Sequence, residues 1–442
     1  MRSRIAGAAA VLIVAGATTA LFAQQPPARG GAPNAARTAA DWPTWRGPNR
    51  DGRSPDTGLL RQWPQGGPRL LMTAKNLGAG FSSVAVTGGR IYTMGDRGGA
   101  QHLIALSDSD GREAWSVRVG PVWDDEYPGP RGTPAVSDGM VYAVGTEGDV
   151  VAVDAATGQE KWRRNLVSDF GGRMMSSWKF AESPLVDGDR LVVTPGGRDA
   201  VMVALNKKTG QDIWRAKMGA IDGRGPEGAG YSSIVISNGG GVKQYIQLTG
   251  RGVISVRASD GWFMWGYGKV ANNIANISTP IVTGDHVFAS TGYGTGAALL
   301  KIAAAGDRTS VSEVYFLDPG TFQNHHGNMV LVGQHLFAGH GHNRGIPIAL
   351  DLATGKVLWG GDIRNAGQGS AAVSYADGHL YFRYQNGVMM LIEASPQGYR
   401  EKGSFQIPNV GSIPSWSHPV IINGRLYLRE QGNLYVYDVK EN

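Results

Sequence analysis

The sequence predicts an all-β protein, a β-propeller of eight four-stranded blades. The spacing Gly-x-x-x-Trp occurs five times, and successive tryptophans are 47, 52 and 51 residues apart, followed by a gap of 94 that spans two periods. Short alternating apolar segments meet at tight turns such as Asp138-Gly139 and Asp187-Gly188, which is a strong hairpin signal. No long stretch of helical periodicity follows residue 40. Four short strands per repeat are typical of propeller blades.

Each repeat contains a turn of the pattern Asp-x-x-Thr-Gly, as in the segments 151–158, 203–210 (with Asn for Asp) and 348–355. The Asp or Asn side chain can bond nearby backbone N–H groups, and the glycine can adopt a positive φ. The next strand ends in a tryptophan, a large ring suited to packing between neighbouring sheets. We therefore predict a structural docking role for five tryptophans: Trp115, Trp162, Trp214, Trp265 and Trp359.

One repeat lacks its tryptophan, and Val314-Tyr315-Phe316 occupies the corresponding strand. Aligned repeats place the blade starts near eight positions: Ser82, Thr133, Ser183, Ser232, Thr279, Gly327, Ser370 and His418. The last repeat leaves no room for an outer strand, whereas the apolar segment 69–73 has no repeat of its own. This segment is predicted to complete the last blade and close the ring, because closure removes an exposed sheet edge.

Other architectures remain alternatives at this point. An open β-solenoid usually has shorter repeats, and two β-sandwiches need no fixed period. A ring of seven blades follows if the repeat starting at Gly327 or Ser370 is misassigned.

The N-terminal residues differ in composition from the repeats. A basic start (Arg2, Arg4), an apolar run over 5–22 and small residues around Ala23 predict a signal peptide over 1–23, with a permanent membrane anchor as the alternative. Residues 24–40, rich in Pro, Gly and Ala, read as a flexible leader before the propeller at 41–442. We therefore expect a periplasmic or secreted protein.

Composition narrows the classes of partner and site. The chain has no cysteine, which excludes disulfides, thiolate metal sites and a cysteine-linked lipid anchor. The net charge of +6 is spread along the chain and forms no dense basic stripe, so no nucleic-acid partner is expected. We expect a monomer that binds a small polar ligand or another extracytoplasmic protein.

The loops that join successive blades are long in places and should gather at one end of the channel, where binding sites on rigid scaffolds usually lie. Residues just before the first strands are predicted to ring this mouth: Phe81, Arg131, Glu182, Tyr231, Asn276, His325, His326, Gln368 and Trp416. The candidates predicted to face a ligand are Arg131, Glu182, Tyr231, Asn276, Gln368 and Trp416. This mixture suits a small polar or anionic ligand. Alternatively, the same residues bond to neighbouring loops and waters in a plugged channel.

Two groups near this mouth are candidate ligands for metal ions. Four histidines of the sixth repeat are one group: His325, His326, His340 and His342. Neutral imidazole binds Zn, Cu or Ni, but no carboxylate joins these histidines at ligand spacing, and hydrogen bonding is the alternative role. The acidic run 123–127 could supply a base or Ca²⁺ ligands, or be a solvated loop.

The succession of strand, Asp-x-x-Thr-Gly, strand and Trp is similar to the pyrroloquinoline-quinone (PQQ) repeat of quinoprotein alcohol dehydrogenases and of outer-membrane protein assembly factor B lipoproteins. The segment 41–52 also resembles one found ahead of such repeats in secreted bacterial proteins. The resemblance covers about 41–442 and implies a propeller. The dehydrogenases often carry a vicinal cysteine pair, and the assembly factors a lipidated cysteine, which this chain lacks. No local motif matches the family's calcium ligands or catalytic Asp.

Two main functions follow as hypotheses. The first is a ligand- or partner-binding scaffold outside the cytoplasm, with no assigned cofactor, because the repeats are complete and no catalytic motif carries over. The second, implied by the resemblance, is a PQQ- and Ca-dependent alcohol or sugar dehydrogenase. An extracellular glycan binder is a third. The sequence leaves open whether the chain is an enzyme.

Overall fold

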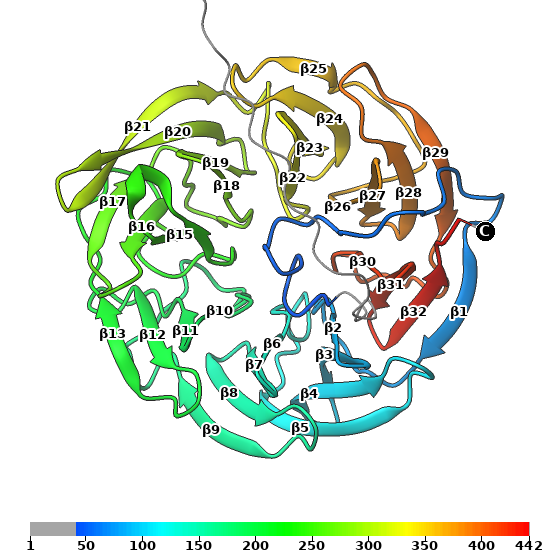
Figure 1. Cartoon of the computed structure of the whole chain (residues 1–442), viewed down its shortest axis with the longest axis horizontal. Coiled ribbons are helices and arrows are strands. Elements are labelled where there is room, and N and C mark those ends of the chain that lie inside the picture. Colours follow the sequence, from blue (N-terminus) through cyan, green and yellow to red (C-terminus); the bar gives the residue numbers. More distant parts are fainter. Residues whose placement is uncertain (1–40, 442) are drawn as a thin grey trace, which may run out of the picture. The chain divides into compact units, whose positions relative to one another are not determined.

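The computed structural model describes residues 41–441, so the predicted signal peptide and leader lie outside the described residues. Within this part, 32 strands form eight antiparallel four-stranded sheets that surround a central channel (Figure 1). One short 3-10 helix, η1 (Gly239–Gly241), joins β14 and β15. The predicted eight-bladed all-β propeller is confirmed. No helix among residues 41–441 is both long and apolar enough to cross a membrane.

Each blade contains an innermost, a second, a third and an outer strand, and the blades follow one another in chain order. The innermost strands of blades 1 to 8 are β2 (Ala85–Thr87), β6 (Ala135–Ser137), β10 (Leu185–Asp187), β14 (Val235–Ser237), β18 (Ile281–Thr283), β22 (Met329–Val332), β26 (Ala371–Ala376) and β30 (Val420–Ile422). The second strands are β3 (Arg90–Arg97), β7 (Met140–Val144), β11 (Arg190–Val193), β15 (Gln244–Leu248), β19 (His286–Thr291), β23 (His335–His340), β27 (His379–Tyr384) and β31 (Arg425–Glu430).

The third strands are β4 (Ala100–Ser107), β8 (Asp149–Asp154), β12 (Met202–Asn206), β16 (Val253–Arg257), β20 (Gly296–Ala305), β24 (Ile346–Asp351), β28 (Val388–Glu393) and β32 (Asn433–Asp438). The outer strands are β5 (Glu113–Pro121), β9 (Glu160–Asn165), β13 (Asp212–Ala216), β17 (Phe263–Tyr267), β21 (Arg308–Leu317), β25 (Val357–Gly360), β29 (Glu401–Gln406) and, for blade 8, β1 (Arg69–Ala74).

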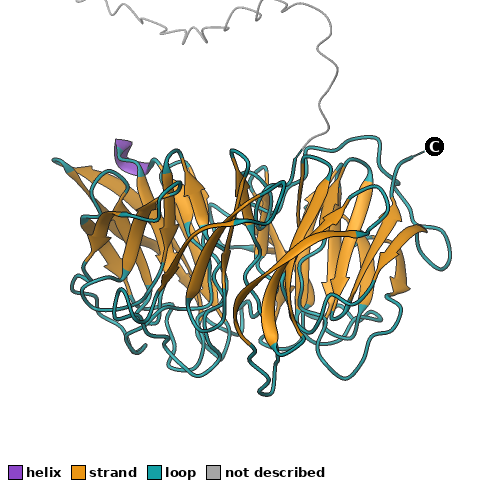
Figure 2. Cartoon of the chain, turned by 90° about the horizontal axis from the view of Figure 1, so that it is seen from below, coloured by secondary structure: helices purple, strands orange, loops and turns teal. Residues whose placement is uncertain are grey.

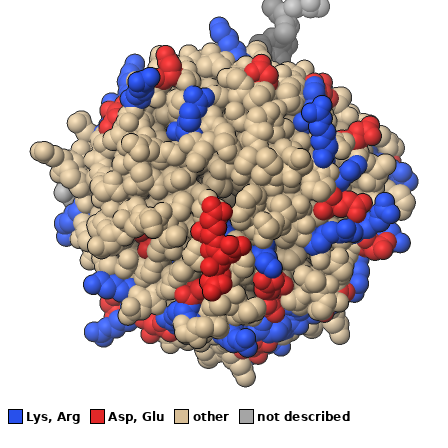
Figure 3. All heavy atoms as spheres, turned by 180° about the vertical axis from the view of Figure 1, so that it is seen from behind, with Lys and Arg blue, Asp and Glu red and all other residues tan. Residues whose placement is uncertain are grey.

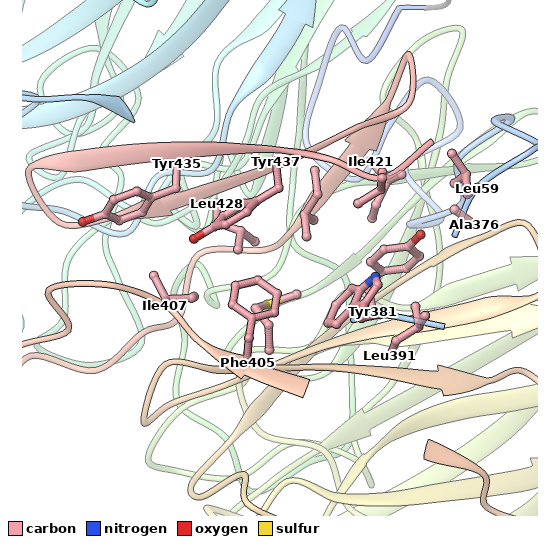
Figure 4. Close-up of a cluster of buried hydrophobic side chains, with 14 residues drawn as sticks. Leu59, Ala376, Tyr381, Leu391, Phe405, Ile407, Ile421, Leu428, Tyr435 and Tyr437 are labelled. Atoms are coloured by element: carbon pink, nitrogen blue, oxygen red, sulfur yellow. The ribbon is translucent and has the colours of Figure 1, made fainter. Parts of the chain in front are cut away.

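The ring closes as predicted, because β1 pairs antiparallel with β32 and Thr73 lies opposite Tyr435. Eight buried hydrophobic clusters fill the spaces between neighbouring blades. Figure 4 shows one of them, in which Tyr435 and Leu428 of blade 8 face Phe405 of blade 7. The core of this protein is therefore a series of interfaces between sheets.

The tryptophan at the outer strand of a blade packs on the turn of the next blade. A Cβ atom at Gly210 would lie 2.7 Å from the Trp162 ring, and the Trp162 indole N–H donates to Lys207 O at 2.9 Å. The same arrangement recurs at Trp115 and Trp214. A side chain at the turn glycine would thus separate the two blades.

In the blade without a tryptophan, Tyr315 of β21 takes over this contact. Its ring would lie 2.9 Å from a Cβ at Gly355, and its hydroxyl donates to Leu352 O at 2.6 Å. The tyrosine therefore reproduces both the ring packing and the hydrogen bond of the indole. A different aromatic residue satisfies the same geometric requirement.

Two tryptophans depart from the pattern. Trp265 donates its indole N–H to Gln244 Oε1 of its own blade at 3.1 Å. The facing turn of blade 5, residues 306–307, contains no Asp-x-x-Thr-Gly sequence. Trp359 donates to Ser395 O of the next blade at 2.7 Å. All five predicted tryptophans therefore lie where blades are joined, although their hydrogen-bond partners differ.

Around the channel, the backbone N–H just before one first strand donates to a side-chain oxygen of the next blade. We call this chain of bonds the inner belt. It comprises Ser83 N to Thr133 Oγ1 (3.2 Å), Thr133 N to Ser183 Oγ (2.9 Å), Ser183 N to Ser233 Oγ (3.0 Å), Ser233 N to Thr279 Oγ1 (2.9 Å) and Thr279 N to Asn328 Oδ1 (2.7 Å). The inner belt holds the starts of the innermost strands of six blades at the same level along the channel.

Residues 41–54 cross the channel, and we call this segment the N-terminal plug (dark blue near the centre of Figure 1). Trp42 exchanges two backbone hydrogen bonds of 2.8 Å with Val86 of blade 1. The buried Arg46 donates to carbonyl oxygens of blades 6 and 7, and the buried Arg50 donates to two carbonyl oxygens of blade 3. The plug thus links blades on opposite sides of the ring.

The docking contact predicts different costs for alanine at two glycines with positive φ. At Gly188 (φ +59°) no atom lies near a new Cβ, so Gly188→Ala should cost only about 1 kcal/mol of backbone strain. At Gly210 (φ +71°) the Cβ also clashes with Trp162, which adds roughly 1–3 kcal/mol. Urea unfolding of both variants measures the difference, and equal midpoints would contradict the packing role.

The inner belt predicts that Ser183→Ala destabilises the ring. Alanine leaves the buried N–H of Thr133 without its acceptor, at a cost of about 1–3 kcal/mol. Ser183→Thr retains the hydroxyl, and threonine already occupies the equivalent position at 133 and 279, so this variant should unfold close to wild type. A thermal midpoint unchanged by the alanine substitution would show that the bond contributes nothing.

Candidate functional site

A cavity of about 410 Å³ lies in the channel, between the N-terminal plug and the loops that join the blades. Figure 2 shows that these loops are longer than the turns at the other side of the propeller. Trp45 of the plug forms part of the wall, and residues of the inner belt, including Ser183 and Asn328, form another part. The plug therefore converts an open channel into a cavity with an inner end.

Aromatic rings make up much of the cavity wall. Besides histidines, the aromatic residues lining it are Trp45, Phe81, Tyr127, Trp178, Tyr231, Tyr293 and Trp416. The Trp416 ring centroid lies 4.0 Å from that of His326, 4.8 Å from that of Tyr127 and 5.1 Å from that of Phe81. Such a wall favours a ligand with a flat face or apolar edges.

Four histidines also line the cavity: His325, His326, His342 and His418. The His325 centroid lies 3.7 Å from that of His326 and 4.2 Å from that of His342. Burial lowers the pKa of His325 and of His418 to about 3, and it also lowers the pKa of His326 and His342. These rings are therefore neutral at neutral pH.

A hydrogen-bond chain fixes the tautomer of His325. The Ser370 hydroxyl donates to Asn343 Oδ1 at 3.0 Å, so the Ser370 oxygen accepts from His325 Nδ1–H at 2.8 Å. His325 Nε2 then accepts from the Tyr293 hydroxyl at 3.1 Å. All three donors in this chain point toward Asn343, whose oxygen terminates it.

Among residues 41–441, Arg131 is the one Lys or Arg residue on the cavity lining. Its guanidinium donates to Tyr127 O at 2.7 Å and lies 4.2 Å from the Trp123 ring centroid. Burial lowers the pKa of Arg131 to about 10, so the side chain is still charged at neutral pH. The cavity therefore contains a partly desolvated cation held by backbone and aromatic contacts.

Three of the six predicted ligand-facing residues, Arg131, Tyr231 and Trp416, line the cavity. Glu182 does not: it is buried and accepts hydrogen bonds from the Thr194 N–H at 2.7 Å and the Thr194 hydroxyl at 2.9 Å. Burial raises the pKa of Glu182 to about 7. This carboxyl group stabilises the loop structure behind the wall.

Asn276 and Gln368 also lie outside the lining. Asn276 is buried, and its amide donates to Thr249 O at 3.0 Å and Gly250 O at 2.9 Å. The side chain of Gln368 is exposed to solvent. Strand register predicts that both residues lie just before a first strand of a blade. Register does not determine in which direction a side chain points.

The structure does not gather the four predicted metal-binding histidines at one point. His340 lies outside the cavity lining, where its Nδ1 accepts from Gln323 N at 3.3 Å and its ring packs against Phe322. Among residues 41–441, no group of three or more His, Cys, Asp or Glu residues is placed to hold a metal ion. Of the other three histidines, His325 contacts both His326 and His342, and His326 contacts Trp416, with rings tilted by 38–55°.

The acidic run 123–127 borders the cavity at its solvent side. Glu126 and Tyr127 line the cavity, whereas Asp124 and Asp125 are exposed. Figure 3, which views the molecule from the side opposite to Figure 1, shows acidic side chains grouped near the centre of a mostly uncharged surface. Carboxylates are thus present at this end, but on a solvated loop.

Three aromatic lining residues could not be found from the repeats. Trp45 belongs to the plug, which precedes the first repeat, and Trp178 lies on the long loop before blade 3. Tyr293 lies between β19 and β20 with a φ of +56°. The glycine-rich run 292–296 around Tyr293 is a signal that could have identified this loop.

Comparison with curated proteins finds assembly factors and dehydrogenases. The chain is 25% identical over 255 residues to outer membrane protein assembly factor BamB of Shewanella oneidensis, covering 56% of this chain and 60% of that protein. It is 29% identical over 195 residues to quinohemoprotein alcohol dehydrogenase ADH IIB of Pseudomonas putida, covering 38% and 26%. The matches thus span 60% or less of these relatives' lengths.

Solved structures share the fold at low sequence identity. BamB from Moraxella catarrhalis superposes with a TM-score of 0.57 and 15% identity, covering 84% of this chain and 98% of that one. Europium-containing methanol dehydrogenase superposes with a TM-score of 0.65 and 12% identity, covering 91% and 99%. These likenesses establish the common propeller architecture.

The family match covers most of the repeats. The model of the PQQ-repeat family described as "Outer membrane protein assembly factor BamB" matches residues 54–162 and 101–361, more than half of the chain. The matched region contains the Asp-x-x-Thr-Gly turns and the docking tryptophans described above. This chain therefore belongs to the PQQ-repeat β-propeller family represented by outer membrane protein assembly factor BamB.

Proposed function

We propose that this protein is an exported binding propeller that takes up a small polar ligand in its central cavity without catalysing a reaction. The observation that carries the proposal is the cavity itself, about 410 Å³ in volume and lined by aromatic rings and a few polar groups. Small-molecule sites have this composition and roughly 300–1,000 Å³ of volume. The location rests on the predicted signal peptide over 1–23 and on relatives named as outer-membrane assembly factors.

The residues of the cavity do not suit a pair of PQQ and Ca²⁺. PQQ carries several carboxylates, whereas Arg131 is the one cationic Lys or Arg residue that the described part of the chain places on the lining. Ca²⁺ takes six to eight oxygen ligands, commonly from carboxylates. Within the described residues, Glu126 supplies the one carboxylate on the lining, from a solvated loop, and Glu182 is bonded to Thr194 behind the wall. The donor set therefore supports binding of a less highly charged ligand.

The proposal predicts that a cavity ligand raises the unfolding temperature, because a molecule that binds only the folded state stabilises it. The full chain is screened by thermal shift against ring-containing polar compounds. Trp416→Ala should abolish the shift, since this ring contacts three others on the wall. Trp262→Ala is the matched control, because Trp262 is 48% exposed and lies outside the cavity.

A second assay on the same preparation addresses catalysis. PQQ and Ca²⁺ are added, and reduction of an artificial electron-acceptor dye is followed with alcohols and sugars. We expect no substrate-dependent reduction by wild type. Turnover that is lost in Trp416→Ala would contradict the proposal and support the dehydrogenase.

A further inference from the structure

The side-chain amides of the cavity already form hydrogen bonds within the protein, and these bonds determine which of their polar groups remain free. The N–H of Thr279 can only donate, and it binds Asn328 Oδ1 at 2.7 Å. The Trp416 indole N–H can only donate, and it binds Gln385 Oε1 at 3.0 Å. Each amide oxygen is therefore engaged, and within residues 41–441 neither amide nitrogen has a protein partner. Asn328 and Gln385 offer N–H donors.

Two further side chains of the cavity also have free hydrogen-bond donors. Asn343 Oδ1 accepts from both the N–H and the hydroxyl of Ser370, at 3.2 and 3.0 Å, which leaves the amide nitrogen to donate. His342 Nδ1 accepts from Tyr293 N at 3.2 Å, so the neutral ring carries its hydrogen on Nε2. Asn343 and His342 therefore also present donors.

The hydroxyl of Tyr231 does not supply a free acceptor in compensation. The Ser176 hydroxyl donates to Ile274 O at 2.7 Å, so Tyr231 donates to Ser176 Oγ, also at 2.7 Å. The N–H of Trp178 donates to the Tyr231 oxygen at 3.3 Å. This hydroxyl is engaged in both directions, so the unengaged amide groups are donors, whereas the unpartnered Nδ1 of the neutral His326 ring can donate or accept.

The charges around the cavity favour an anion. Arg131 lines it, and the guanidinium carbons of Arg46 and Arg50 lie 5.5 and 5.8 Å from the centroid of the Trp45 ring. Within the described part of the chain, none of these three arginines forms a direct ion pair with a carboxylate, although Asp51, Glu182 and Asp96 interact electrostatically with Arg46, Arg50 and Arg131, respectively. Glu126 opposes them from the exposed rim. Burying a guanidinium without a direct ion pair is costly, and a bound anion would offset part of that cost.

From these observations we infer that the ligand is a planar aromatic ring system carrying one carboxylate, which binds Arg131 and the free amide N–H groups while its ring packs among the aromatic walls. This inference rests on the proposed function and specifies its ligand. One guanidinium matches one carboxylate, and the aromatic walls match a flat ring. A neutral sugar fits less well, because it carries no charge to pair with Arg131.

The inference is tested by calorimetric titration of the full chain with three matched compounds: 2-naphthoate, its neutral amide 2-naphthamide, and decahydro-2-naphthoate, the saturated anion. We expect 2-naphthoate to bind and 2-naphthamide to bind at least about tenfold more weakly, because the amide lacks the charge that strengthens the hydrogen bonds to Arg131. Decahydro-2-naphthoate should bind roughly two- to tenfold more weakly, because it keeps the charge but loses the packing of a flat ring. Equal binding of the amide would overturn the requirement for an anion, and equal binding of the saturated acid would overturn the requirement for a flat ring.

Arg131→Gln should weaken 2-naphthoate binding at least about tenfold while leaving any weak 2-naphthamide binding unchanged. Arg364→Gln is the matched control, because Arg364 is exposed on the loop between β25 and β26 and lies outside the cavity lining. A loss of affinity for both compounds would indicate that Arg131 acts through the structure of its loop, and would overturn its assignment to the carboxylate.

The result also separates this inference from the proposed function. If none of the three compounds binds while another class of compound gives a shift that depends on Trp416, the cavity is a binding site with a different ligand and the inference is wrong. If no compound of any class gives such a shift, both proposals are wrong. The comparison of the three compounds on wild type needs no variant, so it stands even if Arg131→Gln does not fold.

Discussion

The contact between neighbouring blades is the constraint on which this structure depends. A single four-stranded blade has two apolar faces and cannot bury them alone, so each face must be covered by the next sheet. Eight buried clusters occupy these interfaces, and the pairing of β1 with β32 completes the last of them. The turn glycines follow from this requirement, because at Gly210 a side chain would occupy the space of the Trp162 ring.

A closed ring of eight blades leaves a channel, and the N-terminal plug determines what this channel becomes. Arg46 donates to carbonyl oxygens of the innermost strands β22 and β26, and Arg50 donates to those of Ser183 and Pro184 just before β10, which attaches the plug to blades 3, 6 and 7. Both guanidiniums are buried, and their charge lies close to the Trp45 ring. The plug therefore provides an inner wall for the cavity and places two guanidinium groups behind that wall.

The balance of free hydrogen-bond donors and acceptors in the cavity depends on which of its polar groups already bond to other parts of the protein. Inner-belt and indole N–H groups engage the oxygens of Asn328 and Gln385, and Ser370 engages the oxygen of Asn343. These structural bonds thus consume the amide oxygens and leave the amide N–H groups of Asn328, Gln385 and Asn343 free to donate. Structural bonds and ligand preference are coupled in this channel because they share the same side chains.

The sequence by itself determined the propeller, its eight blades and its closing strand, because each depends on local patterns that recur with a fixed period. It also identified Arg131, Tyr231 and Trp416 as residues at the mouth of the channel. Only the tertiary structure decided that Glu182 and Asn276 turn into the protein, and that Trp45, Trp178 and Tyr293 complete the cavity. The physical reason is that strand register gives the height of a residue along the channel, whereas side-chain direction and loop position depend on contacts between segments distant in sequence.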